Sequence, residues 1–348
     1  MEGSNNMENK EHYLARNRSH EQIRNSGAIG SLNEGIEIVL HNLPTRLIAW
    51  PGNGFQTESI HVITVKPGLE SPLYSYQISE EALLCVQGKG EVYLREQWVE
   101  IEPGDIAYFP EQTSHGIRNS ITNKEEFILV SAITPPLVSL YIDSGFYIEL
   151  LGKMDFDAIE EAKKSIIPGK IAETNYLRYR ETHPNIRGWN LDREDIRKHG
   201  ALFNVFRGAE FTANGSPMRF ILWPGHGARQ CGFHLTRCGT GDMFAGHTHP
   251  ISDECVIIWA GTARGFLDGH WFEMGIHECL LAPCGVHHGG PLNIQTKTVN
   301  NSPPSRDTLW GGFASPPQGD LYLRAGYIEN QQVKDPIAIR FSDIEPID

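Results

Sequence analysis

Three side chains that bind metals well stand close together between two glycines of this sequence. The segment G-x5-H-x-H-x4-E-x6-G runs from Gly241 to Gly261 and contains His247, His249 and Glu254. The two histidines are two positions apart, so on a β-strand both side chains leave the same face. A hairpin after the short polar break would bring the carboxylate to the same centre. Two imidazoles and a carboxylate are typical ligands of Mn, Fe, Co, Ni or Zn.

A further donor follows in the segment P-x-G-x2-H, which begins at Pro283 and ends at His288. Taken together, the two segments resemble the paired motifs of the cupin superfamily, although the second lacks that family's leading glycine and trailing asparagine. The resemblance implies a small jelly-roll β-barrel that holds a metal inside it. The ligands that it implies are His247, His249, Glu254 and His288.

An internal repeat indicates that the chain carries two such units. At a shift of 173 positions, the segment from Trp50 to Gly54 falls on the segment from Trp223 to Gly227. Further Trp, Pro, His and Gly positions stay in register until the second copy gains eight residues, after which the shift is 181. We therefore predict an all-β protein of two tandem jelly-roll barrels with a short helical linker, that is, a bicupin.

The domain boundaries follow from the repeat and from the local pattern. Residues 36–65 alternate apolar and polar side chains as half-buried strands do, and the stretch FDAIEEAKKSI favours a helix after the first barrel. The predicted units are a mobile N-terminal lead (1–35), the first barrel (36–149), a linker with helices (150–200), the second barrel (201–328) and a C-terminal tail (329–348).

The first copy keeps only part of the ligand set. Tyr74 and Tyr76 stand where the second copy has its two histidines, while Glu81 and His115 are retained. Neutral phenols are poor ligands for most divalent metals, so we expect the first barrel to be metal-free. Its tyrosines would fill the pocket or bond Glu81 and His115; alternatively, the four residues would form a second pocket for a polar ligand.

The repeat also distinguishes two adjacent histidines. The carboxylate and the last histidine are 34 positions apart in both copies, which selects His288 as the ligand. A shift of one residue on a strand turns a side chain to the other face, so His287 is expected to point away from the metal. His61 and His234 occupy equivalent strand positions in the two copies, and we interpret them as structural residues.

Composition excludes several classes of function. A net charge of −13 and a pI near 5.6 argue against a nucleic-acid or anionic-membrane partner. No apolar run approaches the roughly 18 residues that span a bilayer. The N-terminal segment is polar, and the six cysteines form no CxxC pairs, so we expect a cytoplasmic protein with reduced thiols. A monomer and a homodimer are both compatible with the sequence.

The ligand set predicts one divalent transition metal per chain, with Fe or Mn favoured and Ni or Zn as alternatives. Four protein ligands leave one or two metal positions for substrate, water or O₂. We favour a dioxygenase, an oxidoreductase that acts with O₂ on a small organic metabolite. One alternative is a non-redox isomerase, lyase or hydrolase of a polar or sugar-like metabolite, which the polar segment 293–306 would suit. The other is a non-catalytic bicupin that binds a small molecule.

Further residues are assigned by their types and positions near the motif. Aromatic residues on expected barrel strands could line an apolar substrate pocket, namely Phe244, Trp259, Phe266 and Trp271. In the non-redox alternative a nearby side chain would move a proton, and the candidates are His287, Glu278 and Arg264.

Overall fold

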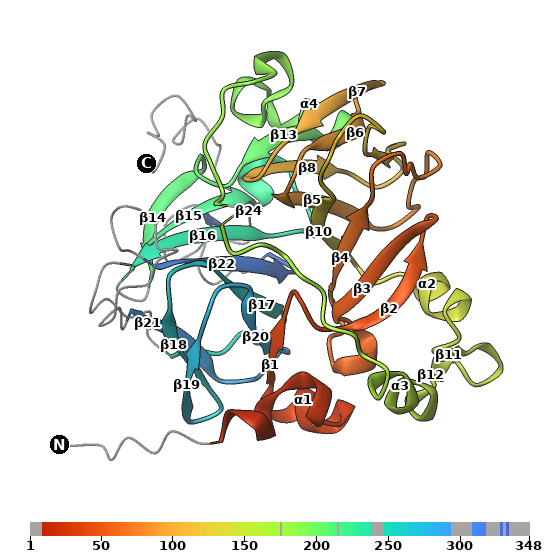
Figure 1. Ribbon diagram of the computed structural model, residues 1–348. Coiled ribbons are helices and arrows are strands. Elements are labelled where there is room, and N and C mark those ends of the chain that lie inside the picture. Colours follow the sequence, from red (N-terminus) through yellow and green to blue (C-terminus); the bar gives the residue numbers. More distant parts are fainter. Residues whose placement is uncertain are drawn as a thin grey trace.

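The computed structural model describes residues 9–174, 176–213, 216–238, 246–293 and 308–317, and two short strands at 328–329 and 332–333. Strands dominate, and they form two barrels side by side (Figure 1). The strands of the first barrel are β2 (Ile36–Leu40), β3 (Leu43–Ala49), β4 (Ser59–Val65), β5 (Glu80–Gln87), β6 (Gly90–Leu94), β7 (Gln97–Ile101), β8 (Asp105–Phe109), β9 (Ile117–Arg118) and β10 (Phe127–Thr134).

The second barrel repeats this arrangement. Its strands are β14 (Ala209–Ala213), β15 (Ser216–Leu222), β16 (Phe233–Cys238), β17 (Asp253–Ala260), β18 (Ala263–Leu267), β19 (His270–Met274), β20 (Glu278–Ala282), β21 (His288–Asn293) and β22 (Thr308–Ser315). The two-stranded pairing of β23 (Ile328–Glu329) and β24 (Gln332–Val333) follows. The predicted all-β fold with two jelly-roll barrels is therefore confirmed.

Each barrel pairs one large sheet with one small sheet. The large sheets have the orders β13-β8-β5-β10-β4-β3-β2 and β1-β20-β17-β22-β16-β15-β14, in which β1 is Ala28–Ser31 and β13 is Ala201–Asn204. The small sheets have the orders β7-β6-β9 and β19-β18-β21. The two orders are identical once the repeat shift is applied.

The two repeats exchange their opening strands. Strand β1 pairs antiparallel with β20 of the second barrel, and β13 pairs antiparallel with β8 of the first. In Figure 1 the red β1 accordingly lies beside the blue-green β20, and the green β13 beside the orange β8. Each exchanged strand follows a short helix, α1 (His20–Ser26) or α4 (Arg193–His199), that ends at a glycine with positive φ. The exchange ties the two barrels into one unit.

This finding changes two sequence-based expectations. Residues 10–31 are not a mobile lead, because they form η1 (Lys10–Tyr13), η2 (Ala15–Asn17), α1 and β1, and β1 completes the second barrel's sheet. Helix α4 is not part of a linker but the counterpart of α1 at the start of the second repeat. Both segments are short and polar, and their pairing partners lie far away in sequence, so local patterns did not identify them.

The segment between the barrels packs on the first barrel. It contains α2 (Val138–Asp143), the hairpin β11 (Tyr147–Ile148) and β12 (Lys153–Met154), and α3 (Phe156–Lys163). Further along, the guanidinium of Arg187 is fully buried and donates to Asp105 on β8 (2.7 Å) and to the carbonyl of Phe203 on β13 (2.9 Å). Because a buried ion pair needs its hydrogen bonds satisfied, these contacts fix the segment in one place.

Alternation along the central strands assigns each side chain to one of two cores. On β5, Ala82 and Leu84 pack in the core between the barrels, whereas Leu83 and Cys85 face the interior of the first barrel. On β17, Cys255, Ile257 and Trp259 likewise face the other barrel. The residues between them, including Glu254, face the interior of the second barrel. Parity on the strand therefore decides which side chains can reach a site inside a barrel.

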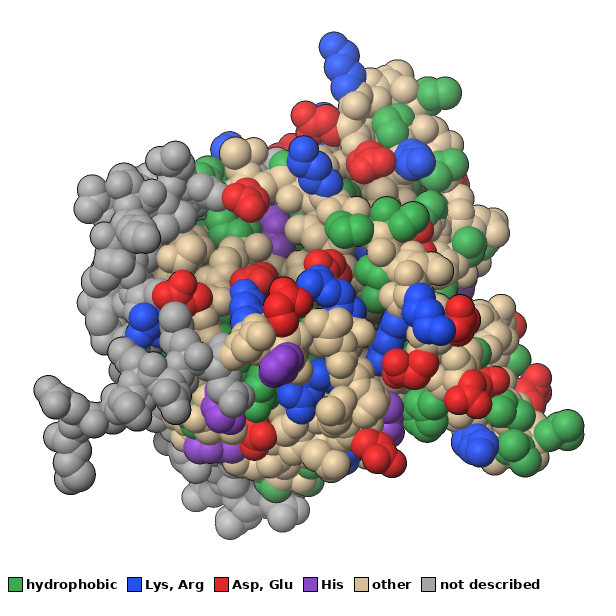
Figure 2. All heavy atoms as spheres, turned by 60° about the horizontal axis from the view of Figure 1, so that its bottom comes forward, with side chains coloured by type: hydrophobic (Ala, Val, Ile, Leu, Met, Phe, Trp, Pro, Cys, Tyr) green, Lys and Arg blue, Asp and Glu red, His purple; other side chains and the backbone are tan. Residues whose placement is uncertain are grey.

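The surface carries mixed charge. On the face shown in Figure 2, Lys and Arg side chains are interspersed with Asp and Glu side chains. No helix of the described residues has the length and apolar character needed to cross a membrane. All six cysteines are free, and five of them are buried.

Candidate metal centre

The four residues that the motif singled out meet inside the second barrel. Glu254 is the second residue of β17, and His288 is the first residue of β21. His247 and His249 lie on the segment that leads into β17. Two backbone hydrogen bonds pair His247 with His288, at 2.8 and 3.0 Å, and hold the two segments together.

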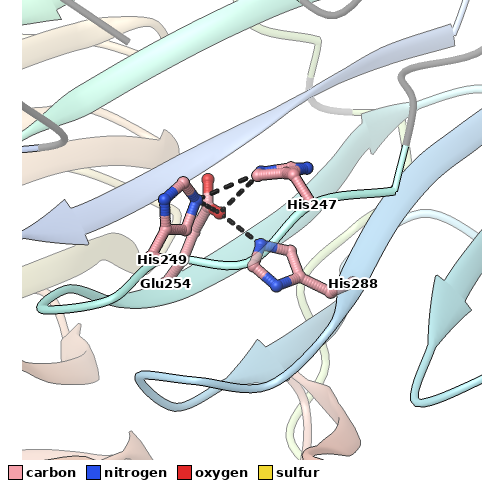
Figure 3. A group of neighbouring side chains, drawn as sticks. All are labelled: His247, His249, Glu254 and His288. Atoms are coloured by element: carbon pink, nitrogen blue, oxygen red, sulfur yellow. Dashed lines mark hydrogen bonds and ion pairs between the residues drawn. The ribbon is translucent and has the colours of Figure 1, made fainter. Parts of the chain in front are cut away.

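The side chains converge on one carboxylate oxygen (Figure 3). Glu254 Oε2 lies 2.7 Å from His288 Nε2, 3.0 Å from His249 Nε2 and 3.9 Å from His247 Nε2. One donor atom from each residue lies within 4.8 Å of the others. His247 is half-buried while the other three are buried, so the centre opens towards the solvent on the side of His247.

One histidine is held in the orientation that a metal needs. His288 Nδ1 donates to the carbonyl of Val286 at 2.9 Å, because a carbonyl can only accept. The other ring nitrogen, Nε2, therefore points at the centre. A hydrogen bond of this kind on the far nitrogen is common for histidines that bind metals.

The carboxylate is held in its charged form. Burial raises the pKa of Glu254, but hydrogen bonds and charge from His249 and His288 outweigh it and keep the pKa well below its ordinary value. Three imidazole nitrogens and an ionised carboxylate oxygen, buried and directed at one point, fit a divalent transition metal.

A fifth residue contacts this set. His234 on β16 is buried, and its Nε2 lies 3.3 Å from Glu254 Oε1, the carboxylate oxygen that the three other histidines do not approach. Burial lowers the pKa of His234, while the charge of Glu254 raises it. The sequence analysis interpreted His234 as a structural residue. The structure places it where it orients the carboxylate of Glu254, and its match to His61 in the repeat was the available signal.

His287 lies apart from the centre. It is exposed, and its ring packs beside Phe266 with the ring centroids 5.0 Å apart. Phe266 in turn packs against Trp271 at 5.2 Å, and Leu267, one residue further along β18, faces the barrel core. The side chains of His287, Phe266 and Trp271 therefore lie on the outer face of the small sheet. The prediction that Phe266 and Trp271 line the pocket is wrong.

The other assigned residues also lie elsewhere. Trp259 packs in the core between the barrels, where its indole donates to the carbonyl of Gly311 at 3.0 Å. It is five positions from Glu254 on the same strand, so it faces the opposite way. Glu278 pairs with Lys10 at 2.6 Å, and Arg264 lies 3.6 Å from Glu273 at the surface. Phe244 lies outside the described residues.

The interior is lined by apolar residues that the sequence analysis did not select. Val256 and Ile258 lie at alternate positions after Glu254 on β17 and so face the same side of the strand. They pack in one cluster with Met218, Phe220 and Trp310. The ring of Trp310 lies 6.1 Å from that of His234. Counting alternate positions from Glu254 along β17 would have identified Val256 and Ile258.

The equivalent centre of the first barrel is saturated by its own hydrogen bonds. Glu81 Oε2 lies 2.8 Å from His115 Nε2 and accepts from the Tyr74 hydroxyl at 3.2 Å, while Oε1 accepts from Ser131 at 2.6 Å. His115 Nδ1 donates to the Thr113 carbonyl at 2.7 Å, the same contact that His288 makes with Val286 in the second barrel. The difference in the first barrel is that the Tyr74 and Ser131 hydroxyls donate to the carboxylate that would otherwise face a metal.

The two tyrosines close this pocket with a residue that the sequence did not indicate. His41, from the turn between β2 and β3, stacks on Tyr74 with ring centroids 3.7 Å apart and bonds the Tyr76 hydroxyl at 2.8 Å. Burial raises the pKa of both tyrosines well above the ordinary value, so they remain neutral phenols. The four predicted residues do come together: Glu81 bonds Tyr74 and His115, and Tyr76 packs against Tyr74 and His115.

Comparison with known proteins agrees with this architecture. Residues 61–131 match the family model of the cupin domain. Three solved structures cover most of the chain with a TM-score of 0.50. They are a mutant oxalate decarboxylase from Bacillus subtilis (14% identity, 83% of this chain and 77% of that one), protein Ylba from E. coli (10%, 83% and 91%) and a putative glyoxylate-induced protein from Pseudomonas aeruginosa (12%, 80% and 84%). A search of the curated proteins gave no match. The first barrel thus matches the cupin domain, and the chain as a whole has the fold of these two-barrel structures.

Proposed function

We propose that this bicupin is a metal-dependent enzyme that acts on a small organic metabolite inside its second barrel. The observation that carries the proposal is the convergence of three imidazole nitrogens on the ionised carboxylate of Glu254. A bound divalent metal would supply Lewis acidity and, if it is redox-active, electrons for O₂. The protein residues fix its position, exclude water on the buried side and leave the side of His247 for a substrate.

Two observations support the dioxygenase form of the proposal. The interior around the centre is apolar, with Phe220, Val256 and Trp310 among its residues, which suits O₂ and the apolar part of a small acid. The three side chains considered for proton transfer lie at the surface or face other partners, so their chemistry does not support the non-redox alternative. Residues 294–306 of the segment whose polarity favoured a sugar-like substrate lie outside the described residues.

The metal and the role of O₂ can be tested in one experiment. Apo-protein is reconstituted separately with Fe(II), Mn(II), Ni(II) and Zn(II), and each form is incubated with oxalate, glyoxylate and a panel of hydroxylated aromatic acids, with and without O₂. We include oxalate and glyoxylate because proteins with this fold carry those names, although at 14% identity or less the likeness concerns the fold. We expect turnover with Fe or Mn that requires O₂.

The control is Glu254→Ala, which lacks the shared carboxylate and is expected to show no turnover with any metal. Turnover without O₂ would reject the dioxygenase and establish an isomerase, lyase or hydrolase. Tight binding of a panel compound without turnover under either condition would favour a binding protein.

A further inference from the structure

The residue that precedes the ligand carboxylate is itself a buried carboxylate that faces the other barrel. Asp253 is the first residue of β17 and is 0% exposed. Its Oδ2 accepts from the backbone amides of Gln56 and Thr57, at 2.5 and 2.7 Å, and lies 2.9 Å from Thr57 Oγ1. The backbone amide of Asp253 donates back to Thr57 Oγ1 at 3.1 Å. The start of β17 is thus bound to a loop of the first barrel.

The other oxygen of the same carboxylate contacts the loop that carries the last ligand. Asp253 Oδ1 accepts from the amide of Cys284 at 2.8 Å, and Arg24 from the N-terminal segment lies 3.5 Å away. The next residue along, Gly285, donates to the carbonyl of His249 at 2.9 Å. One buried carboxylate therefore links the strand of Glu254 and the loop before His288 to a common anchor.

From these contacts we propose that Asp253 is a positioning residue for the metal centre and that the first barrel holds the ligands in register through it. The inference rests on the proposed metal site. Because Glu254 is its covalent neighbour and Cys284 is four residues before His288, a change in the Asp253 contacts displaces two ligands together. The first barrel, which lacks the histidine pair, then serves to fix the geometry of the centre in the second barrel.

The repeat supplies a matched control at the equivalent position. Glu80, the residue before Glu81, is also buried and accepts from the amides of Gln230 and Cys231, each at 2.9 Å, and from that of Arg229. Positions 229 and 230 correspond to positions 56 and 57 in the repeat. The same cross-barrel contact therefore exists twice, once beside the histidine cluster and once beside the self-bonded centre of the first barrel.

The test compares Asp253→Asn with Glu80→Gln in the full chain. Each change keeps the shape of the side chain and replaces one acceptor oxygen with an amide nitrogen, so each lowers the melting temperature. We expect Asp253→Asn to raise the dissociation constant for Mn(II), measured by titration calorimetry, by about tenfold or more, as changes of residues that support metal ligands do. Its Mn(II) EPR spectrum should also differ from that of the wild type. Glu80→Gln should keep the wild-type constant and spectrum.

Equal Mn(II) affinities for the two variants, whether both weakened or both unchanged, would overturn the inference, because the contact would then act on stability alone. If Asp253→Asn does not fold, Thr57→Val, which removes only a side-chain hydroxyl, replaces it with the same expected direction, and Thr57→Ser should restore the affinity. Failure of the wild-type chain to bind Mn(II), Fe(II), Ni(II) or Zn(II) is a different result, which rejects the metal site and the inference with it.

Discussion

At the scale of single residues, the two adjacent histidines provide the sharpest contrast. His288 Nε2 is 2.7 Å from Glu254, whereas the ring of His287 packs on Phe266 at the surface. We expect His288→Ala to lose the bound metal and His287→Ala to retain it, with metal content measured on the purified variants. The opposite pattern would show that the register of β21 is wrong.

A second residue-scale prediction concerns pH. His226 is 3% exposed, and its Nδ1 donates to the carbonyl of Ile221 at 2.9 Å; burial lowers its pKa from 6.5 to about 3. The unfolded chain therefore takes up the proton first. The stability of the native neutral ring is fully present above pH 6.5 and is lost at about 1.4 kcal/mol per pH unit as the pH falls from 6.5 towards 3.

The repeat offers a substitution that removes this dependence. Asn53 occupies the equivalent position, and its Nδ2 donates to the carbonyl of Ile48 at 2.7 Å. His226→Asn should preserve the bond to Ile221 and remove the titrating ring. In urea unfolding, the free energy of unfolding of the variant relative to the wild type should then rise by about 2 kcal/mol from pH 7 to pH 5. Parallel pH profiles would contradict the assignment of His226 as a buried neutral histidine.

The sequence predicted the cluster of candidate ligands better than it predicted their surroundings. Motif spacing and the repeat register identified His247, His249, Glu254 and His288 as neighbours, because motif spacing on strands is a local property. The aromatic residues were chosen by type and not by parity, and Trp259 consequently lies on the opposite face of β17. His41 was missed because its contact with Tyr74 joins segments whose proximity depends on the closure of the barrel.

At the scale of elements, the strand exchange predicts that a substitution in the opening strand of one repeat destabilises the barrel of the other repeat. Ile29 on β1 is 1% exposed and packs in the interior cluster of the second barrel, whereas Leu202 on β13 is fully buried in that of the first. We expect Ile29→Ala to destabilise the second barrel, and Leu202→Ala the first, each by about 2–4 kcal/mol. Hydrogen exchange should show lower protection in β20 for Ile29→Ala and in β8 for Leu202→Ala.

Equal loss of protection in both barrels for each variant would show that they unfold as a single unit. Loss of protection in the first barrel alone for Ile29→Ala, or in the second barrel alone for Leu202→Ala, would contradict the strand exchange. The exchange could not be predicted from local patterns, because AIGS and ALFN are four-residue strands whose partners are found only by tertiary pairing. The barrels themselves were predictable, since their strands alternate and repeat over most of the chain.

At the scale of the whole molecule, duplication has produced two barrels with different centres. In the second, three imidazole nitrogens converge on the ionised carboxylate of Glu254. In the first, one imidazole contacts the carboxylate of Glu81, and the Tyr74 and Ser131 hydroxyls donate to it. The same fold thus presents a metal-binding set on one side of the interface and a closed hydrogen-bond network on the other.

The most direct test of this account is the metal stoichiometry of the full chain. Apo-protein is loaded with Mn(II) or Fe(II) under anaerobic conditions, freed of unbound metal and analysed for metal per chain. We predict one ion per chain for the wild type and for Glu81→Ala, and none for Glu254→Ala. Two tightly bound ions per chain, or one ion that survives Glu254→Ala and is lost in Glu81→Ala, would contradict a single metal centre in the second barrel.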